Sequence, residues 1–327
     1  MWPYWLMFVV SSLGVLGPAR LDPGARRAAW LVAAVVFTLA IGLRHEVGGD
    51  WFAYLAHLHR LDGESSPAVL TGGDPGYYLL NWVVAQLGGT IYWVNLACGA
   101  ILMSGVIVFA RNQPFPWLAL LVAVPYLIIV VGMGYTRQAA ALGFVLLGLT
   151  ALSHQQIRRF VVWVVLGTLF HKSAVLILPV AALAASRRRL WTMIWVGVIA
   201  VLTAYFFVFE AADRLWENYV VADYHSQGGF IRVLMNAVPA VLFFTLGRYL
   251  RLGEGERRLW RWMSLLALAC VPLVLISSTA TDRVALYLIP LQLFVFSRLH
   301  LITHSPSGRG VIVLGWCCTT PWWSSSG

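Results

Sequence analysis

Long apolar runs that end at arginines most constrain what this chain can fold into. The run from Thr90 to Ala110, for example, holds no charged residue and is followed by Arg111. A helix of about 20 apolar residues crosses the hydrocarbon core of a bilayer. Only 11% of the 327 residues are charged, whereas a soluble domain carries roughly 25%. We therefore predict an all-α, polytopic integral membrane protein, since a helix satisfies its own backbone polar groups inside lipid.

The distribution of arginines gives the predicted topology. When successive loops are assigned alternately to the two sides, sixteen of the 23 basic residues but three of the thirteen acidic residues fall on one side. The positive-inside rule makes this side cytoplasmic. The net charge of +10 then reflects membrane topology, and nucleic acid is not an expected partner. We expect about ten to twelve membrane helices, including short re-entrant or hairpin segments.

Two apolar segments are unsuited to a simple crossing. The run from Pro75 to Leu87 is roughly 20 Å long as a helix, so we predict a re-entrant or interfacial segment. The segment 160–186 is flanked by basic clusters at 158–159 and 187–189, and both clusters should be cytoplasmic. The chain therefore has to go out and return within this segment, with His171-Lys172-Ser173 at the tip of the hairpin.

Residues 1–302 are expected to form a single polytopic membrane domain. The run from Trp2 to Leu16 lacks a basic segment before it and a clear cleavage site, so we interpret it as a first membrane helix. Residues 303–327 form an atypical C-terminal tail, with Cys317-Cys318 and Trp322-Trp323 where another helix is expected. A truncated or frameshifted end is one explanation for this tail.

Four arginines lie at predicted outer helix ends, against the positive-inside bias: Arg44, Arg137, Arg232 and Arg283. A guanidinium group binds phosphate through two hydrogen bonds and stays charged at any relevant pH. Several of them together would hold a pyrophosphate at the membrane surface. For any one of them, snorkelling or pairing with a nearby acid, such as Asp282 beside Arg283, explains the position equally well.

Acidic and histidine residues near these arginines are candidates for proton transfer. Glu46 and Asp50 follow Arg44 closely, and either one could act as a general base on a sugar hydroxyl or shape the site by pairing with arginine. His171 is a third candidate, because it lies at the predicted hairpin tip beside the only lysine. Asp74 precedes a proline, so N-capping is its favoured role.

Aromatic residues near the same positions could stack on sugar rings, although aromatic belts at membrane interfaces explain them at least as well. They are Trp51, Tyr54, Tyr77, Tyr78 and Tyr135. The four cysteines show no metal-ligand spacing, so neither a metal nor another cofactor is expected.

Taken in order, these residues resemble the EpsG family of exopolysaccharide polymerases, a Wzy-like group. The segments that carry the resemblance span residues 44 to about 298. They are Arg44 with Gly48-Gly49-Asp50-Trp51 and Tyr54, Pro75-Gly76-Tyr77, Arg137-Gln138, Phe170-His171-Lys172-Ser173-Ala174, and Arg283 with Tyr287. The family often has glutamate where this chain has Asp74.

The resemblance implies a multi-pass glycosyltransferase of the bacterial cytoplasmic (inner) membrane. Such an enzyme polymerises oligosaccharide repeat units that are carried on undecaprenyl pyrophosphate, at the outer face of the bilayer. A chain-length regulator and a flippase are candidate partners. Under this hypothesis Glu46, Asp50 or His171 takes the acceptor proton. The substrate-binding residues are then Arg44, Asp74, Tyr77, Arg137, Arg232 and Arg283.

Other functions remain open at this point. An O-antigen ligase or another lipid-linked-sugar glycosyltransferase would use the same arginines with a different acceptor. A flippase or transporter would place charges at mid-membrane and usually shows repeat symmetry, whereas here the charges cluster at one face. A membrane acyltransferase would need a cytoplasmic histidine with an acid, and His154, His300 and His304 have no convincing partner in the sequence.

Overall fold

The computed structural model describes residues 2–17, 22–61, 73–184, 189–207, 228–250 and 252–302, and within them all regular structure is helical. The predicted tail at 303–327 and most of the predicted outer loop at 209–231 lie outside these ranges. The α-helices are α1 (Trp2–Leu16), α2 (Pro23–Gly42), α3 (Trp51–Arg60), α5 (Pro75–Gln86), α6 (Ile91–Arg111), α7 (Pro116–Ala123), α8 (Thr136–Ser153), α9 (Ile157–Phe170), α10 (Pro179–Ala184), α11 (Arg189–Phe207), α13 (Gly229–Leu246), α14 (Glu254–Ile276), α15 (Ser278–Leu286) and α16 (Pro290–Phe296). The shorter elements are the π-helix η1 (Val124–Gly132) and the 3-10 helices η2 (Lys172–Ile177), η5 (Gly247–Tyr249) and η6 (Leu299–Leu301).

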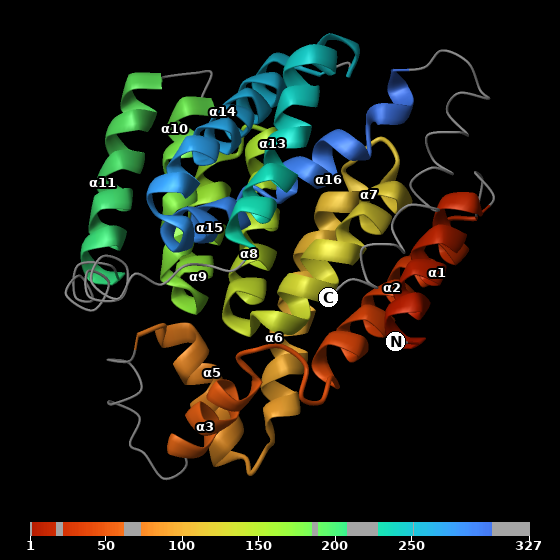
Figure 1. Ribbon diagram of the computed structural model, residues 1–327, viewed down its shortest axis with the longest axis vertical. Helices are drawn as coiled ribbons and strands as arrows, with labels where there is room; N and C mark the ends of the chain where they lie inside the picture. The colour runs from red at the N-terminus through yellow and green to blue at the C-terminus, as the bar shows by residue number, and fades with distance from the viewer. Residues whose placement is uncertain are drawn as a thin grey trace.

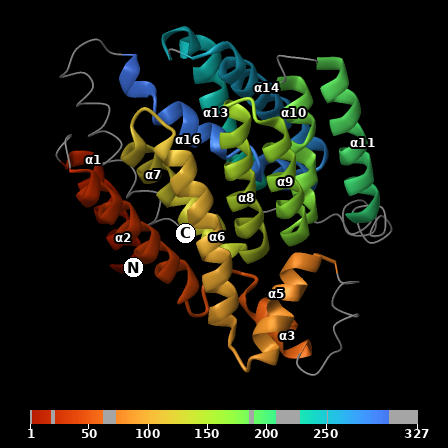
Figure 2. The same ribbon diagram turned by 180° about the vertical axis from the view of Figure 1, so that it is seen from behind.

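Helices α6, α8 and α9 form the centre of a helical bundle (Figure 1). Helices α1 and α2 lie along one edge, and α10 and α11 lie along the opposite edge. Helices α13 to α16 cover one face, which is toward the viewer in Figure 1 and lies behind the other helices in Figure 2. The short helices α3 and α5 pack together at one end of the bundle, beside the start of α6.

Five helical segments in the described residues are long and apolar enough to cross a membrane: α2, α6, α8, α14 and the continuous segment of α13 and η5. The segments Ser278–Leu286 and Pro290–Leu301 are bent by 53° at their junction and add a sixth crossing if they count as one. The expected number of ten to twelve is not confirmed, because other apolar helices, including α1 and α10, are shorter.

Large apolar side chains are exposed on the outer helices, as expected where a bundle faces lipid. Leu31 on α2 is 65% exposed, Trp191 on α11 is 61% exposed, and Ile276 at the end of α14 is 82% exposed. A surface of this kind is unfavourable in water. Together with the long apolar helices, it shows a polytopic helical membrane protein.

The backbones of α6 and α8 approach each other closely through glycine. A Cβ atom on Gly143 would lie 2.7 Å from the carbonyl carbon of Ile101 and 2.8 Å from Cα of Leu102, and one on Gly105 would overlap the backbone of Gly143. Small residues allow such contacts between membrane helices, where packing rather than hydrophobic transfer drives association. This contact brings the start of α8 beside Asn95 of α6, whose Oδ1 accepts a hydrogen bond from Thr136.

The predicted break in the helix at His171 is confirmed, because α9 ends immediately before this residue. Helix α9 stops at Phe170, and His171 adopts an extended conformation with φ −155° and ψ 114°. The next residues form η2, which packs back against α9. The predicted short segment after Pro75 is α5, which has 12 residues and is not among the candidate spans.

We expect Gly143→Ala to lower the Tm of the purified protein in detergent. The added methyl group would press on backbone atoms of Ile101 and Leu102, and overpacking of this kind costs about 1–3 kcal/mol. Gly197→Ala in α11 is the matched control, because its Cβ would meet nothing within 4 Å. Alanine is the better helix former by up to about 1 kcal/mol, so the control should be as stable as the native protein or more so. Equal Tm values for the two variants would contradict the tight contact.

Candidate functional site

Three segments that are far apart in the sequence meet at the carboxylate of Asp74. Arg137 Nη1, at the start of α8, donates to Asp74 Oδ2 at 2.9 Å. The backbone N–H of Lys172 donates to Oδ1 at 3.2 Å. His171 Nδ1 lies 3.7 Å from Oδ2, which is an electrostatic contact rather than a hydrogen bond. Asp74 is only 2% exposed, so these groups replace the water that an ionised carboxylate needs.

A glycine allows the start of α5 to lie directly against the end of α9. A Cβ atom on Gly76 would lie 2.9 Å from Leu169 Cβ and 3.1 Å from the Leu169 carbonyl oxygen. This approach places Asp74 next to the residues that follow α9. The prediction that Asp74 caps α5 is wrong: it occupies the N-cap position, but its side chain makes no capping hydrogen bond. Its carboxylate is used for tertiary contacts instead.

The surroundings favour an ionised Asp74 and a neutral His171, two residues that lie between helices and outside the candidate spans. Burial alone would raise the pKa of Asp74, but the His171 ring, the Arg137 charge and the Lys172 amide outweigh burial and hold this pKa below its usual value. Burial lowers the pKa of His171, and the positive charges of Arg137 and Arg283 lower it further, against the opposite effect of Asp74. A neutral imidazole can accept a proton.

Arg137 presents its charge above two tyrosine rings. Its guanidinium carbon lies 5.8 Å from the ring centre of Tyr54 and 5.9 Å from that of Tyr77. The Tyr54 hydroxyl lies 3.4 Å from Asp50 Oδ2, which connects Asp50 to this cluster. Tyr77 is only 1% exposed and lies under Arg137, so in this structure it supports Arg137. Direct contact of Tyr77 with substrate stays a prediction. The Arg137 side chain is 39% exposed and is therefore an accessible cation.

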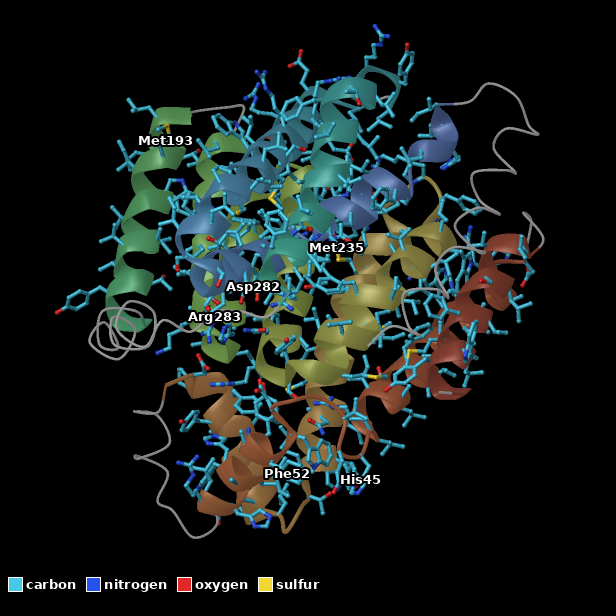
Figure 3. All side chains as sticks on the ribbon, viewed as in Figure 1. His45, Phe52, Met193, Met235, Asp282 and Arg283 are labelled. Carbon is cyan, nitrogen blue, oxygen red and sulfur yellow. The ribbon has the colours of Figure 1, made fainter. Side chains whose placement is uncertain are left out.

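The residues around His171 include three that were not assigned a role from the sequence. Gln138 Nε2 lies 3.3 Å from His171 Nε2, and Ser173 Oγ lies 3.4 Å from the Tyr287 hydroxyl. Gln138, Ser173 and Tyr287 all belong to segments that resemble the EpsG family, and this resemblance was the feature of the sequence that could have identified them. Arg283 influences both His171 and Tyr287 electrostatically. Figure 3 shows Arg283 beside Asp282 on the side of the bundle that faces α5.

Arg44 lies inside the protein rather than on a rim. It is 6% exposed, and its Nη1 donates to the carbonyl oxygens of Ile41 at 3.0 Å and Gly132 at 3.3 Å. Its Nη2 donates to Asn95 Oδ1 at 3.3 Å and Thr136 Oγ1 at 2.6 Å. Carbonyl groups at the end of a helix lack intrahelical partners, and Arg44 satisfies them at the ends of α2 and η1. These contacts do not support the expected direct binding of substrate by Arg44.

Arg232 is committed to an ion pair between α13 and α15. Its Nε and Nη2 donate to the two carboxylate oxygens of Asp282, each at 2.6 Å. The sequence suggested Arg283 as a partner of Asp282, and the structure shows that Arg232 forms a bidentate pair with this carboxylate. Its charge is largely compensated, so the structure favours a bracing role for Arg232 over a phosphate-binding one.

The loop that carries Glu46 packs on the turn before α8, but the Glu46 side chain is exposed and lies near His45. Gly48 has φ +96°, and a Cβ there would lie 2.9 Å from Gly134 Cα. The side chain of Glu46 is 57% exposed, and its Oε1 lies 3.8 Å from His45 Nε2. Among the described residues, Glu46 forms no ion pair or hydrogen bond with Asp74 or Arg137, so the structure does not bring this candidate base into the cluster.

Several buried polar atoms around the cluster have no hydrogen-bond partner among the described residues. They include His171 Nδ1, Gln138 Oε1 and the Tyr77 hydroxyl. Native proteins leave few such groups unpaired, and those that remain often mark a functional site. The described residues contain no group of three or more His, Cys, Asp or Glu side chains that could hold a metal ion. The arrangement can bind an anion at Arg137 and take up a proton at His171.

Comparisons with known proteins give one match. No curated protein and no solved structure matches the chain. The family model described as the EpsG family matches residues 27–321, which is nearly the whole chain and includes all the residues of the cluster. The family is associated with exopolysaccharide polymerisation. The chain belongs to the EpsG family and is a polysaccharide-polymerase-like membrane protein.

Proposed function

We propose that this protein is a polysaccharide polymerase. It transfers a growing glycan from undecaprenyl pyrophosphate to a lipid-linked oligosaccharide repeat unit, on the outer face of the bacterial cytoplasmic membrane. The observation that carries the proposal is the cluster of Asp74, Arg137 and His171, in which one accessible cation and one neutral imidazole are held together by a buried carboxylate.

Arg137 is the residue that we assign to the pyrophosphate. Its Nη1 is bound to Asp74, but its side chain is 39% exposed, so the guanidinium group is accessible to an anion. Negative charge grows on the pyrophosphate oxygen as the glycosidic bond breaks. A cation that is already positioned stabilises this charge without reorganising during the reaction. Arg283, which acts electrostatically on the same histidine, is the second candidate for this role.

His171 is the residue that we assign as general base. The acceptor hydroxyl oxygen attacks the anomeric carbon of the donor glycan, and the bond between this carbon and the pyrophosphate oxygen breaks. The electron pair stays on the leaving pyrophosphate, and the hydroxyl proton passes to the neutral imidazole. Asp74, 3.7 Å away, then stabilises the imidazolium that forms.

The other two candidate bases are less well placed. Asp50 reaches the cluster through the Tyr54 hydroxyl, at 3.4 Å, and is therefore one residue removed from Arg137. Glu46 is exposed and faces His45. We therefore assign Asp50 to positioning of Tyr54 and give Glu46 no role in proton transfer.

Arg137→Gln is expected to reduce polymer synthesis by about 100-fold or more, because it removes a positioned charge that stabilises the leaving group. Polymer amount and length in cells that depend on this protein measure the effect, with membrane levels of the protein checked by immunoblot. Arg60→Gln is the matched control, since Arg60 is an exposed arginine on the neighbouring helix α3. Wild-type polymer from Arg137→Gln would overturn the assignment. Transfer of a single unit to another lipid, in place of a polymer, would indicate a ligase.

His171→Gln is expected to slow polymerisation by about 100-fold or more, as for loss of a general base, while His59→Gln on the exposed side of α3 should have little effect. The base must be neutral, and the pKa of His171 lies below the ordinary value of about 6.5. Activity should therefore persist at pH 6.5 and fall only at lower pH. Asp74→Asn removes the charge that favours imidazolium and should move this loss to still lower pH. Rates in proteoliposomes between about pH 5 and pH 8 test the point, and half-loss at or above pH 6.5 would contradict it.

Arg44→Lys is expected to destabilise the fold more than it changes the chemistry. One ammonium group cannot replace four hydrogen bonds that point to Ile41, Asn95, Gly132 and Thr136, and each hydrogen bond to a charged group is worth about 1.5–3 kcal/mol. Thermal unfolding in detergent should show a lower Tm than for Arg60→Lys. An unchanged Tm with loss of polymer would instead assign Arg44 to the substrate.

A further inference from the structure

A cavity with a partly polar lining is found at the end of the bundle opposite to the Asp74 cluster. Its volume is about 670 Å³, and it is lined by the ends of α6 and α8, the start of α14 and the turn after α16. Helix α8 runs from Arg137 at one end to Ser153 in the cavity wall, which is about 24 Å at the rise of an α-helix. Figure 2 shows α6 and α8 running between the two ends. The cavity is therefore separate from the proposed catalytic site.

The lining of the cavity contains a buried arginine that is paired with one glutamate. Arg298 is 4% exposed, and its Nη2 donates to Glu256 Oε1 at 2.7 Å. Its Nη1 donates to the side-chain oxygen of Gln113, and its guanidinium group lies over the ring of Phe294 at 3.8 Å. The Nε–H of Arg298 has no acceptor among the described residues. The indole N–H of Trp260, which also lines the cavity and is 1% exposed, has none either.

A second arginine contributes its charge to the lining. Arg111 lines the cavity, is exposed and forms no ion pair within the described part of the chain. His154 lies beside it, with Nε2 at 3.1 Å from Asn112 Oδ1. Two arginines and one glutamate therefore line the same space, so the cavity carries a net positive charge. The lining also contains leucines, among them Leu149, and the ring of Trp260.

We propose that this cavity binds a phosphate group that is attached to an apolar or aromatic body. Arg111 is the exposed cation of the lining, and its positive charge attracts an oxyanion. The guanidinium group of Arg298 lies in the same lining. The volume falls within the range of small-ligand sites, about 300–1,000 Å³, so the ligand is a small molecule or a lipid headgroup rather than a macromolecule. Two sources present this chemistry: an anionic phospholipid from the surrounding leaflet and a soluble nucleotide.

The test uses the full-length protein in nanodiscs made of phosphatidylcholine, with Tm as the readout. One arm replaces part of this lipid with phosphatidylglycerol, and the other titrates adenosine monophosphate. A ligand that binds the native state raises Tm, and we expect a rise of several degrees in at least one arm. The arm that responds identifies the source of the phosphate.

Variants connect the shift to the cavity. Arg111→Gln should require about ten times more ligand for the same rise in Tm. Ser153→Trp, which fills the cavity, should abolish the rise. Arg158→Gln removes an exposed arginine at the start of α9 that is not in the lining, and this control should keep the full shift. Arg111 is exposed, so its variant remains informative if Ser153→Trp fails to fold.

The inference does not depend on the proposed polymerase activity. Arg137→Gln should retain the full Tm shift, because Arg137 lies at the other end of α8. No shift with either probe, or an equal shift in native protein and Arg111→Gln, would overturn the inference while leaving the polymerase assignment untouched. A shift that is lost in Arg137→Gln but kept in Arg111→Gln would also overturn it.

Discussion

The buried carboxylate of Asp74 is the interaction on which the site depends. An ionised carboxylate without water is costly unless charged or polar donors surround it. Here the donors come from Arg137 on α8 and the backbone of Lys172 after α9, with the ring of His171 nearby. Satisfying one charge therefore requires α5, α8 and α9 to meet at the same point. The need to stabilise the buried Asp74 carboxylate therefore also explains the geometry of the site.

The arginines at this end of the bundle differ in role because they differ in burial and partners. Arg44 closes the ends of two helices, and Arg232 joins two helices through Asp282. Arg137 is also paired, but its side chain remains partly accessible. A guanidinium group has five donors, so it can hold a structural partner and still bind a ligand. The number of donors that remain accessible separates a binding arginine from a bracing one.

The two ends of the bundle are chemically distinct but share the same central helices. Asn95 and Thr136, at the starts of α6 and α8, meet at the Arg44 network. The other ends of these helices form the wall of the cavity that contains Arg298. The glycine contact packs α6 and α8 closely along the path between the proposed polymerase site and the cavity.

The sequence by itself determined the helical membrane class, the break at His171 and the family, because apolar run length, flanking arginines and motif order are local properties. It also pointed to Arg137 and His171. Only the tertiary structure decided which polar groups meet: that Asp74 holds Arg137 instead of capping α5, that Arg44 is buried, and that Glu46 stays apart. These outcomes depend on how closely the helices approach each other. A contact between two segments that are far apart in the sequence, such as that of Gly76 with Leu169 or of Arg44 with the Gly132 carbonyl, cannot be recognised in either segment alone.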